Sequence, residues 1–110
     1  MGEEIEIRIY RGRMSRAPFS AWLASLEDKR TIAVIQARLN RIRLGNVGDS
    51  RPLGEGVHEL RIDFGPGYRI YFGRDGRTVV VLLCAGGKKT QRRDITTAKE
   101  FWRDYKHGED

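Results

Sequence analysis

Basic side chains recur at short intervals in the second half of the chain. Arg61 and Arg69 lie within HELRIDFGPGYRIYF (residues 58–72), and KKTQRR (residues 88–93) adds four more, which are Lys88, Lys89, Arg92 and Arg93. Guanidinium groups stay protonated, and their forked N–H donors match the oxygens of a phosphate group. If a sheet brings such residues together, they can bind a phosphate and stabilise further charge that develops on it.

The overall charge favours the same kind of partner. The 110 residues carry 21 Lys and Arg against 15 Asp and Glu, so the formal net charge is +6 and the isoelectric point is near 9.9. Such a balance favours a polyanionic partner, either nucleic acid or an acidic protein segment. The alternative is a basic surface that contacts only solvent.

Composition narrows the class of protein. A chain of 110 residues predicts a single domain, residues 1–110. Cys84 is the only cysteine, which excludes a disulfide framework and a multi-cysteine metal site. The opening MGEEIEIRIY has no features of a signal peptide, and the apolar run Val79–Ala85 is too short to cross a bilayer. We therefore expect a cytoplasmic protein without a membrane partner.

The first half of the chain predicts a strand and then two helices. The alternating isoleucines of EIEIRIYR (residues 4–11) predict a half-buried strand. Pro18 suits the first turn of one helix, and a second helix should run from a cap at Asp28 to Gly45. The residues that would face the core from these helices are Phe19, Trp22, Leu23, Leu26, Ile32, Ile35, Leu39 and Ile42. We expect NVGDSRPLGEG (residues 46–56) to be a loop.

Residues 58–72 predict two antiparallel strands, each with one apolar face. The two apolar faces coincide if Ile62 lies opposite Ile70, with Gly65–Gly67 as a three-residue turn. Asp75 and Gly76 then predict a two-residue turn into a third strand, which pairs Phe72 with Val79. That third strand is apolar on both faces, so we expect it inside the sheet.

This register determines what surrounds the two arginines. It places Arg61 opposite Tyr71 and Asp63 opposite Arg69, so the arginines become diagonal neighbours on the face away from the helices. Like charges held in this way repel, which favours an anion that bridges them. The alternative is that Glu59 and Asp63 already neutralise the arginines across the strands.

The last segment, TQRRDITTAKEFWRDYKHGED (residues 90–110), predicts a helix that begins near Asp94. Its apolar positions Ile95, Ala98, Trp102 and Tyr105 share one face. The arginine face of the sheet would also carry Val80, Leu82 and Cys84, and this apolar area needs a cover. We expect the helix to cover one end of that face and to leave a shallow groove, with the basic residues 88–93 along its rim.

Two segments together carry a resemblance to a known family. ELRIDFGPGYRIYF (residues 59–72), followed by VVVLLCAGGKKTQRRDITTAKEF (residues 79–101), resembles the RelE/ParE superfamily of type II toxin–antitoxin toxins, in particular its HigB-like addiction module killer branch. The resemblance implies an α+β fold of order β-α-α-β-β-β-α, with a helical hairpin packed on one face of a mainly antiparallel sheet. It also implies a ribosome-dependent mRNA endoribonuclease that needs no metal or cofactor, because the 2′-hydroxyl of the RNA is the nucleophile.

The resemblance also assigns roles to residues. Arg69 matches the arginine that contacts the scissile phosphate, Arg61 matches a basic position on the preceding strand, and Lys89 stands where RelE-type toxins have another arginine. Two positions depart from that pattern, because Glu59 replaces a lysine and Ile95 stands near the place of a tyrosine. A different general base is then needed, and the candidates are Glu59, His58 and Tyr71, of which Glu59 is preferred and His58 is expected to be structural. The residues expected to bind RNA are Tyr71, Lys88, Gln91, Arg92 and Arg93.

The partners expected from the resemblance are a cognate antitoxin, of the helix-turn-helix kind, together with mRNA and the ribosome. Operator DNA would be contacted only through the antitoxin. Two other functions stay open because Glu59 and Ile95 depart from the RelE pattern. One is a ParE-like inhibitor that blocks a large partner such as DNA gyrase without cleaving anything, and the other is a nontoxic remnant that only binds an antitoxin.

Overall fold

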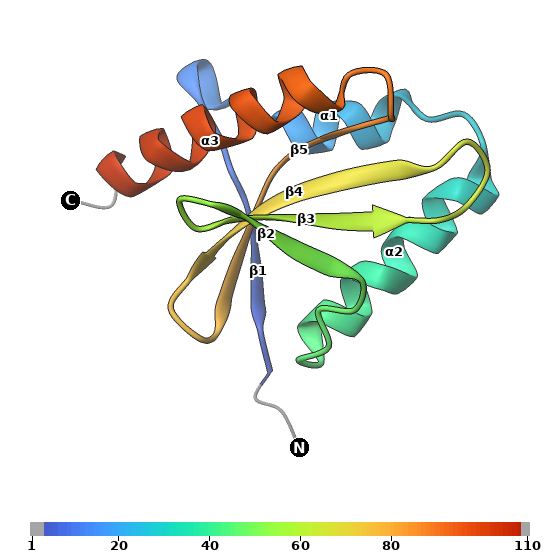
Figure 1. Cartoon of the computed structure of the whole chain (residues 1–110), viewed down its shortest axis with the longest axis horizontal. Helices are drawn as coiled ribbons and strands as arrows, with labels where there is room; N and C mark the ends of the chain where they lie inside the picture. Colours follow the sequence, from blue (N-terminus) through green and yellow to red (C-terminus); the bar gives the residue numbers. More distant parts are fainter. Residues whose placement is uncertain (1–3, 109–110) are drawn as a thin grey trace.

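The computed structural model describes residues 4–108 as an α+β fold with a five-stranded sheet and three helices (Figure 1). The strands lie in the order β1-β5-β4-β3-β2; β1 runs parallel to β5, and all other neighbours are antiparallel. In chain order the elements are β1 (Glu6–Ile9), a 3₁₀ turn (Arg13–Ser15), α1 (Pro18–Ser25), α2 (Lys29–Arg43), β2 (Ser50–Gly54), β3 (Val57–Ile62), β4 (Tyr68–Asp75), β5 (Val79–Gly86) and α3 (Gln91–Gly108).

The helical hairpin confirms the prediction from the sequence. Pro18 is the first residue of α1, and the Asp28 carboxylate caps α2 by accepting a hydrogen bond from the Arg30 amide at 3.0 Å. Gly45 follows α2 with a φ of 93°, a left-handed conformation that a glycine adopts without strain. Both helices pack on one face of the sheet, where their apolar side chains meet Leu60, Ile62, Ile70, Phe72, Val80 and Leu82.

The opposite face of the sheet is covered by α3, as expected. Ala98 and Trp102 are buried there against Val57, Tyr71, Val81, Leu83 and Cys84. Trp102 lies directly over Gly73, where a Cβ atom would overlap with the indole ring. Within residues 4–108, no helix has both the length and the apolar composition that are needed to cross a membrane.

The first strand and the last helix are joined by side-chain hydrogen bonds. Arg8 Nη1 donates to the Tyr105 hydroxyl at 2.8 Å, and the Tyr10 hydroxyl donates to Asp104 Oδ2 at 2.7 Å. The Tyr10 ring also stacks on Phe101 with ring centroids 4.8 Å apart. The two ends of the described chain therefore hold one another at the β1 edge of the sheet.

The register between β3 and β4 differs from the prediction by two residues. Ile70 lies opposite Leu60 rather than Ile62, and residues 63–67 form the connection instead of a three-residue turn. The tight turn lies inside this connection, since the Gly67 amide donates to the Phe64 carbonyl at 3.0 Å. A shift of two residues leaves every side chain on its own face, so the apolar pattern cannot distinguish the two registers.

The register between β4 and β5 was also predicted incorrectly, and here the faces change. Phe72 lies opposite Leu82 rather than Val79, and a bulge separates the Tyr71 and Phe72 pairs. Val80 and Leu82 therefore face α1 and α2, whereas Cys84 faces α3 as expected. The prediction that β5 is an internal strand is confirmed, and burial on both sides is the reason that its sequence could not fix its faces.

The segment predicted as a loop contains β2, an additional edge strand that pairs with β3. Glu55 and Gly56 form the two-residue turn between them, both with positive φ (59° and 86°). Two-residue turns of this kind match the twist of a hairpin. Pro52 is compatible with β2 because an edge strand leaves some amide positions unpaired.

Candidate phosphate-binding site

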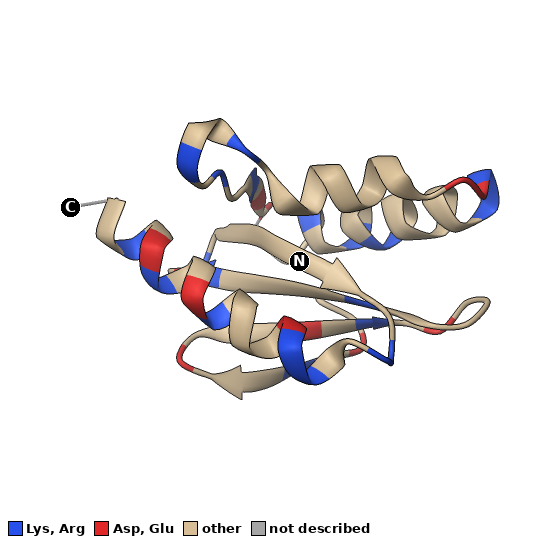
Figure 2. Cartoon of the chain, turned by 90° about the horizontal axis from the view of Figure 1, so that it is seen from above, with Lys and Arg blue, Asp and Glu red and all other residues tan. Residues whose placement is uncertain are grey.

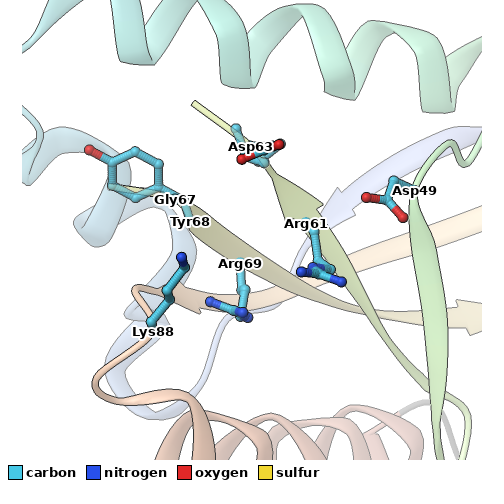
Figure 3. A pocket seen from close by; sticks show the side chains of 8 residues that line it. Asp49, Arg61, Asp63, Gly67, Tyr68, Arg69 and Lys88 are labelled. Atoms are coloured by element: carbon cyan, nitrogen blue, oxygen red, sulfur yellow. The ribbon is translucent and has the colours of Figure 1, made fainter. Parts of the chain in front are cut away.

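Arg61 and Arg69 lie directly opposite one another on β3 and β4, closer than the diagonal arrangement that was predicted. Both side chains extend on the α3 side of the sheet (Figure 3). Together with Lys88, which follows β5, they line an open pocket of about 160 Å³. The complete lining is Asp49, Arg61, Ile62, Asp63, Gly67, Tyr68, Arg69 and Lys88.

The electrostatics of this pocket favour an anion. Directly opposed like charges destabilise an antiparallel pair of strands, and Arg61 faces Arg69 in this way. Within residues 4–108, neither Arg61 nor Lys88 forms an ion pair. Arg69 is only 9% exposed, and its buried Nε atom has no hydrogen-bond partner. A phosphate in the pocket would accept hydrogen bonds from the guanidinium groups that line it and relieve the repulsion between the two arginines.

Glu59 lies behind the pocket as a buried anion. Its side chain is fully buried, and its two oxygens accept hydrogen bonds from Arg51 Nε and Gln91 Nε2, both at 2.9 Å. Arg69 Nε is 3.6 Å from the oxygen that Gln91 binds. Burial raises the pKa of Glu59, but the hydrogen bonds from Gln91 and Arg51 and the charges of Arg51 and Arg69 outweigh burial and lower it overall.

This network corrects several sequence interpretations. Glu59 has no contact with solvent, so the structure does not support it as a general base that meets the substrate. Gln91, expected to bind RNA, instead links α3 to Glu59. Neither of the cross-strand pairs expected from the sequence, Asp63 with Arg69 and Glu59 with Arg61, forms within the described residues; Glu59 lies beside Arg69 instead. Glu59 is therefore a positioning residue that holds Arg69 against the sheet.

The two other candidates for proton transfer are structural as well. Tyr71, also expected to stack on an RNA base, is fully buried against α3, and burial together with the charge of Glu59 raises its pKa. His58 stacks on Phe72 with ring centroids 5.2 Å apart, as expected for a partly buried histidine. Burial, followed by the charge of Arg74, lowers the pKa of His58. Neither side chain lines the pocket.

The basic residues at the start of α3 divide into two groups. Lys88 lines the pocket with the two arginines, whereas Lys89 lies with Arg92 and Arg93 around a separate shallow depression. The resemblance assigned Lys89 to catalysis, but the lysine that lines the pocket is its neighbour Lys88. Figure 2 shows the basic residues at the start of α3, but the expected groove rim is present only in part, because only Lys88 among them lines the pocket.

Sequence reasoning missed other residues of the site. Asp49 and Asp63 are exposed and line the pocket, and Tyr68 borders it while its ring packs against Trp22 on the other side of the sheet. Arg51, which binds Glu59, was assigned to a loop. The pair Glu55 and Gly56 was an available signal for the hairpin, but a bulge between Pro52 and Gly54 is also needed to place Arg51 opposite Glu59. Among residues 4–108, no cluster of His, Cys, Asp and Glu is suited to hold a metal ion.

Comparison with known proteins identifies the family. Residues 21–103 match the profile of the phage-derived Gp49-like proteins (DUF891). A protein of Haemophilus influenzae, described as uncharacterised, is 46% identical over 81 residues, which cover 74% of this chain and 82% of the relative. The match to the family profile includes β3, β4 and Lys88, which carry the pocket. The chain therefore belongs to the Gp49-like family of phage-derived proteins, a family associated with toxin–antitoxin modules.

Proposed function

We propose that this protein is a ribosome-dependent mRNA endoribonuclease, the toxin of a type II toxin–antitoxin module, similar to the HigB-like branch of the RelE/ParE superfamily. Membership of a family associated with toxin–antitoxin modules supports the toxin assignment. The observation that supports RNA cleavage is the opposed pair Arg61 and Arg69, which meets Lys88 in an open pocket. Two cations without an acidic partner, Arg61 and Lys88, together with Arg69 beside Glu59, are suited to the phosphate at which the chain is cut.

In the proposed reaction the 2′-hydroxyl oxygen of the RNA attacks the adjacent phosphorus, and the bond from phosphorus to the 5′-oxygen breaks. The products are a 2′,3′-cyclic phosphate and a 5′-hydroxyl, so the nucleophile comes from the RNA itself. Negative charge on the phosphate oxygens increases in the transition state. Arg69 would donate to these oxygens from its fixed position beside Glu59, while Arg61 and Lys88 add charge from the two sides of the pocket.

Proton transfer requires a group that reaches the pocket. Glu59 and Tyr71 are both fully buried, whereas Asp49 and Asp63 are exposed and line the pocket. We assign the acceptor of the 2′-hydroxyl proton to one of these two aspartates. A general base must lie within reach of the proton that it accepts, and these two carboxylates are the acidic groups that line the pocket.

The partners of the proposed toxin would be mRNA, the ribosome and a cognate antitoxin. The antitoxin would connect the toxin to operator DNA. It would act in the cytoplasm. One observation favours the ParE-like alternative without catalysis, since none of the three proton acceptors expected from the sequence, Glu59, His58 and Tyr71, lines the pocket. Replacement of Asp49 and Asp63 decides between the two functions.

The test is purified protein added to a cell-free translation system, followed by primer extension on the mRNA. Wild type should produce discrete cleavage sites, and Arg69→Ala should reduce the cleavage rate by about 100-fold or more, because one lost donor to the transition state costs about 2.7–4 kcal/mol. Either Asp49→Asn or Asp63→Asn should give a comparable loss. Arg41→Ala, an exposed position on α2, is the control and should cleave normally. Inhibition of translation without cleavage would contradict the nuclease and favour a binding inhibitor.

A further inference from the structure

A second basic surface lies far from the phosphate pocket. The loop between β1 and α1 carries Arg11, Arg13 and Arg16, all exposed, and no acidic residue occurs between Glu6 and Glu27 in the sequence. In Figure 1 this loop lies at the upper left beside the C-terminal half of α3, whereas the segment that enters α3 from β5 lies at the upper right. The two basic surfaces are therefore at opposite ends of α3.

The backbone of this loop is held in an uncommon conformation. Met14 and Ser15 are consecutive non-glycine residues with φ values of 59° and 58°. The loop is closed by hydrogen bonds from the Gly12 amide to the Arg16 carbonyl at 2.8 Å and from Arg11 Nη1 to the Ser15 carbonyl at 3.1 Å. Strained conformations of this kind persist where the surrounding structure enforces them, and they concentrate at functional sites. Here they fix the arginines in an exposed arrangement before any partner binds.

A pocket adjoins the loop and offers more than charge. Its volume is about 390 Å³, and its lining includes Arg13 and Arg16 as well as the apolar surfaces of Tyr10, Pro18 and Phe101. An aromatic and apolar floor beneath two guanidinium groups suits an unpaired nucleotide, because the base can stack while its phosphates bind the arginines.

The lining of the pocket favours a nucleotide over an acidic peptide as the occupant. Tyr10, Pro18 and Phe101 offer apolar surface that suits a base and does not suit a carboxylate side chain. The Asp104 carboxylate also lines the pocket, and its Oδ2 atom accepts the hydrogen bond from Tyr10. Its charge repels phosphates and peptide carboxylates alike, but its remaining acceptor capacity suits an amino group of a base, which an acidic side chain lacks.

We propose that the arginine loop (Arg11–Arg16) and the adjoining pocket form a second RNA-binding site, which takes the base and phosphates of an unpaired nucleotide. The proposal deepens the proposed function, on which it rests for RNA as the ligand. The site would anchor RNA at one end of α3 while the phosphate pocket at the other end performs cleavage. Binding at the loop should then be separable from catalysis.

The experiment uses fluorescence anisotropy with a labelled 2′-O-methyl oligoadenylate of about 12 nucleotides, long enough to span a site of this size. Without a free 2′-hydroxyl the oligonucleotide cannot be cleaved, so the measurement is independent of the nuclease activity. The dissociation constant is measured from about 50 to 200 mM salt, because each phosphate contact on a single strand contributes roughly 0.7 to the slope of log K against log salt.

The triple variant R11S/R13S/R16S should lower the magnitude of this slope by about 2. The matched control is R30S/R41S/R43S on α2, which removes the same number of exposed arginines and the same charge. The control should leave the slope nearly unchanged. Arg69→Ala should slow cleavage in the translation assay by about 100-fold or more yet retain most of the oligonucleotide affinity, since it leaves the arginine loop intact.

Three results would overturn the proposal. One is an unchanged slope in the loop variant, and another is an equal decrease in the loop and control variants, which would indicate a diffuse basic surface. The third is unchanged RNA affinity combined with lost affinity for a polyglutamate peptide, which would make the loop a protein-docking surface. The double variant R13S/R16S retains the Arg11 hydrogen bond that closes the loop. Its slope should fall by roughly 1.4, and the same failure criteria apply to it.

Discussion

Replacement of Glu59 by Gln tests whether a buried carboxylate organises the phosphate pocket. The substitution keeps the shape of the side chain and removes its charge. The carboxylate accepts hydrogen bonds from Arg51 and Gln91, one on each oxygen. An amide has one oxygen, so in the variant one of these donors faces an NH₂ group and loses its acceptor. Arg69 also loses the only anion that lies close to it within the described residues.

The expected cost follows from these contacts. A hydrogen bond to a charged group contributes about 1.5–3 kcal/mol, and breaking a buried ion pair costs about 3–5 kcal/mol. The second figure is an upper limit here, because the Arg51 side chain is 56% exposed and solvent screens its charge. We expect the free energy of unfolding to fall by about 2–3 kcal/mol and the melting temperature to fall by roughly 10 °C or more.

The pH dependence provides an independent check. The folded protein lowers the pKa of Glu59 below the ordinary value of 4.5. A carboxyl group of this kind stabilises the fold fully above its unfolded pKa, and the contribution disappears as the pH falls through the lowered folded value. The difference in unfolding free energy between wild type and Glu59→Gln should therefore be constant from about pH 7 to about pH 5 and should shrink below about pH 4.5.

Glu55→Gln is the matched control for urea or thermal unfolding. Glu55 also lies near two cations, Arg103 at 3.3 Å and Lys99 at 3.7 Å, but its side chain is 48% exposed. Surface pairs contribute about 0–1 kcal/mol, so this variant should be almost as stable as wild type. Equal effects of the two substitutions, or a difference that does not change with pH, would refute the role assigned to Glu59.

Three other substitutions or treatments test separate features. Lys88→Ala should slow cleavage on the order of tenfold or more while Lys89→Ala should have a smaller effect in the primer-extension assay, since only the first of these lysines lines the pocket. Gly73→Ala should destabilise the fold by about 1–3 kcal/mol because its Cβ overlaps with an indole ring, whereas Gly87→Ala, with open space around it, should be neutral in urea unfolding. Burial, followed by the charge of a nearby aspartate, raises the pKa of Cys84 to about 12, so a thiol reagent at about pH 8 should react only after unfolding. Rapid reaction of the native protein would show that this thiol is accessible.

The sequence predicted element types better than it predicted their alignment. In α1, α2 and α3 the apolar residues recur with the 3.6-residue period of a helix. They therefore mark one side of each helix as the side that packs on the sheet. The register of β3 against β4 was wrong by two residues, a shift that the alternation of Leu60 and Ile62 cannot detect. The faces of Val80 and Leu82 were wrong because a strand buried on both sides has no alternation to read.

These alignment errors account for the differences in the candidate site. The charges of Arg61 and Arg69 were correctly expected on one face, but the actual register places them directly opposite one another. Glu59 was expected at the surface because acidic residues are seldom buried unless they are paired. Its partners come from β2 and α3, and β2 was not predicted, so the burial of Glu59 could not be anticipated.

The contacts between β1 and later elements determine when the fold can close during synthesis. The first strand emerges early, but Glu6 pairs with Val79, and Tyr10 binds Asp104. These connections must wait until residues 79 and 104 have been made. The same delay applies to the pocket, because Lys88 and the Gln91 that supports Glu59 follow β5 in the sequence. If the protein is the proposed toxin, its growing chain would lack a complete phosphate pocket until these late residues have been translated.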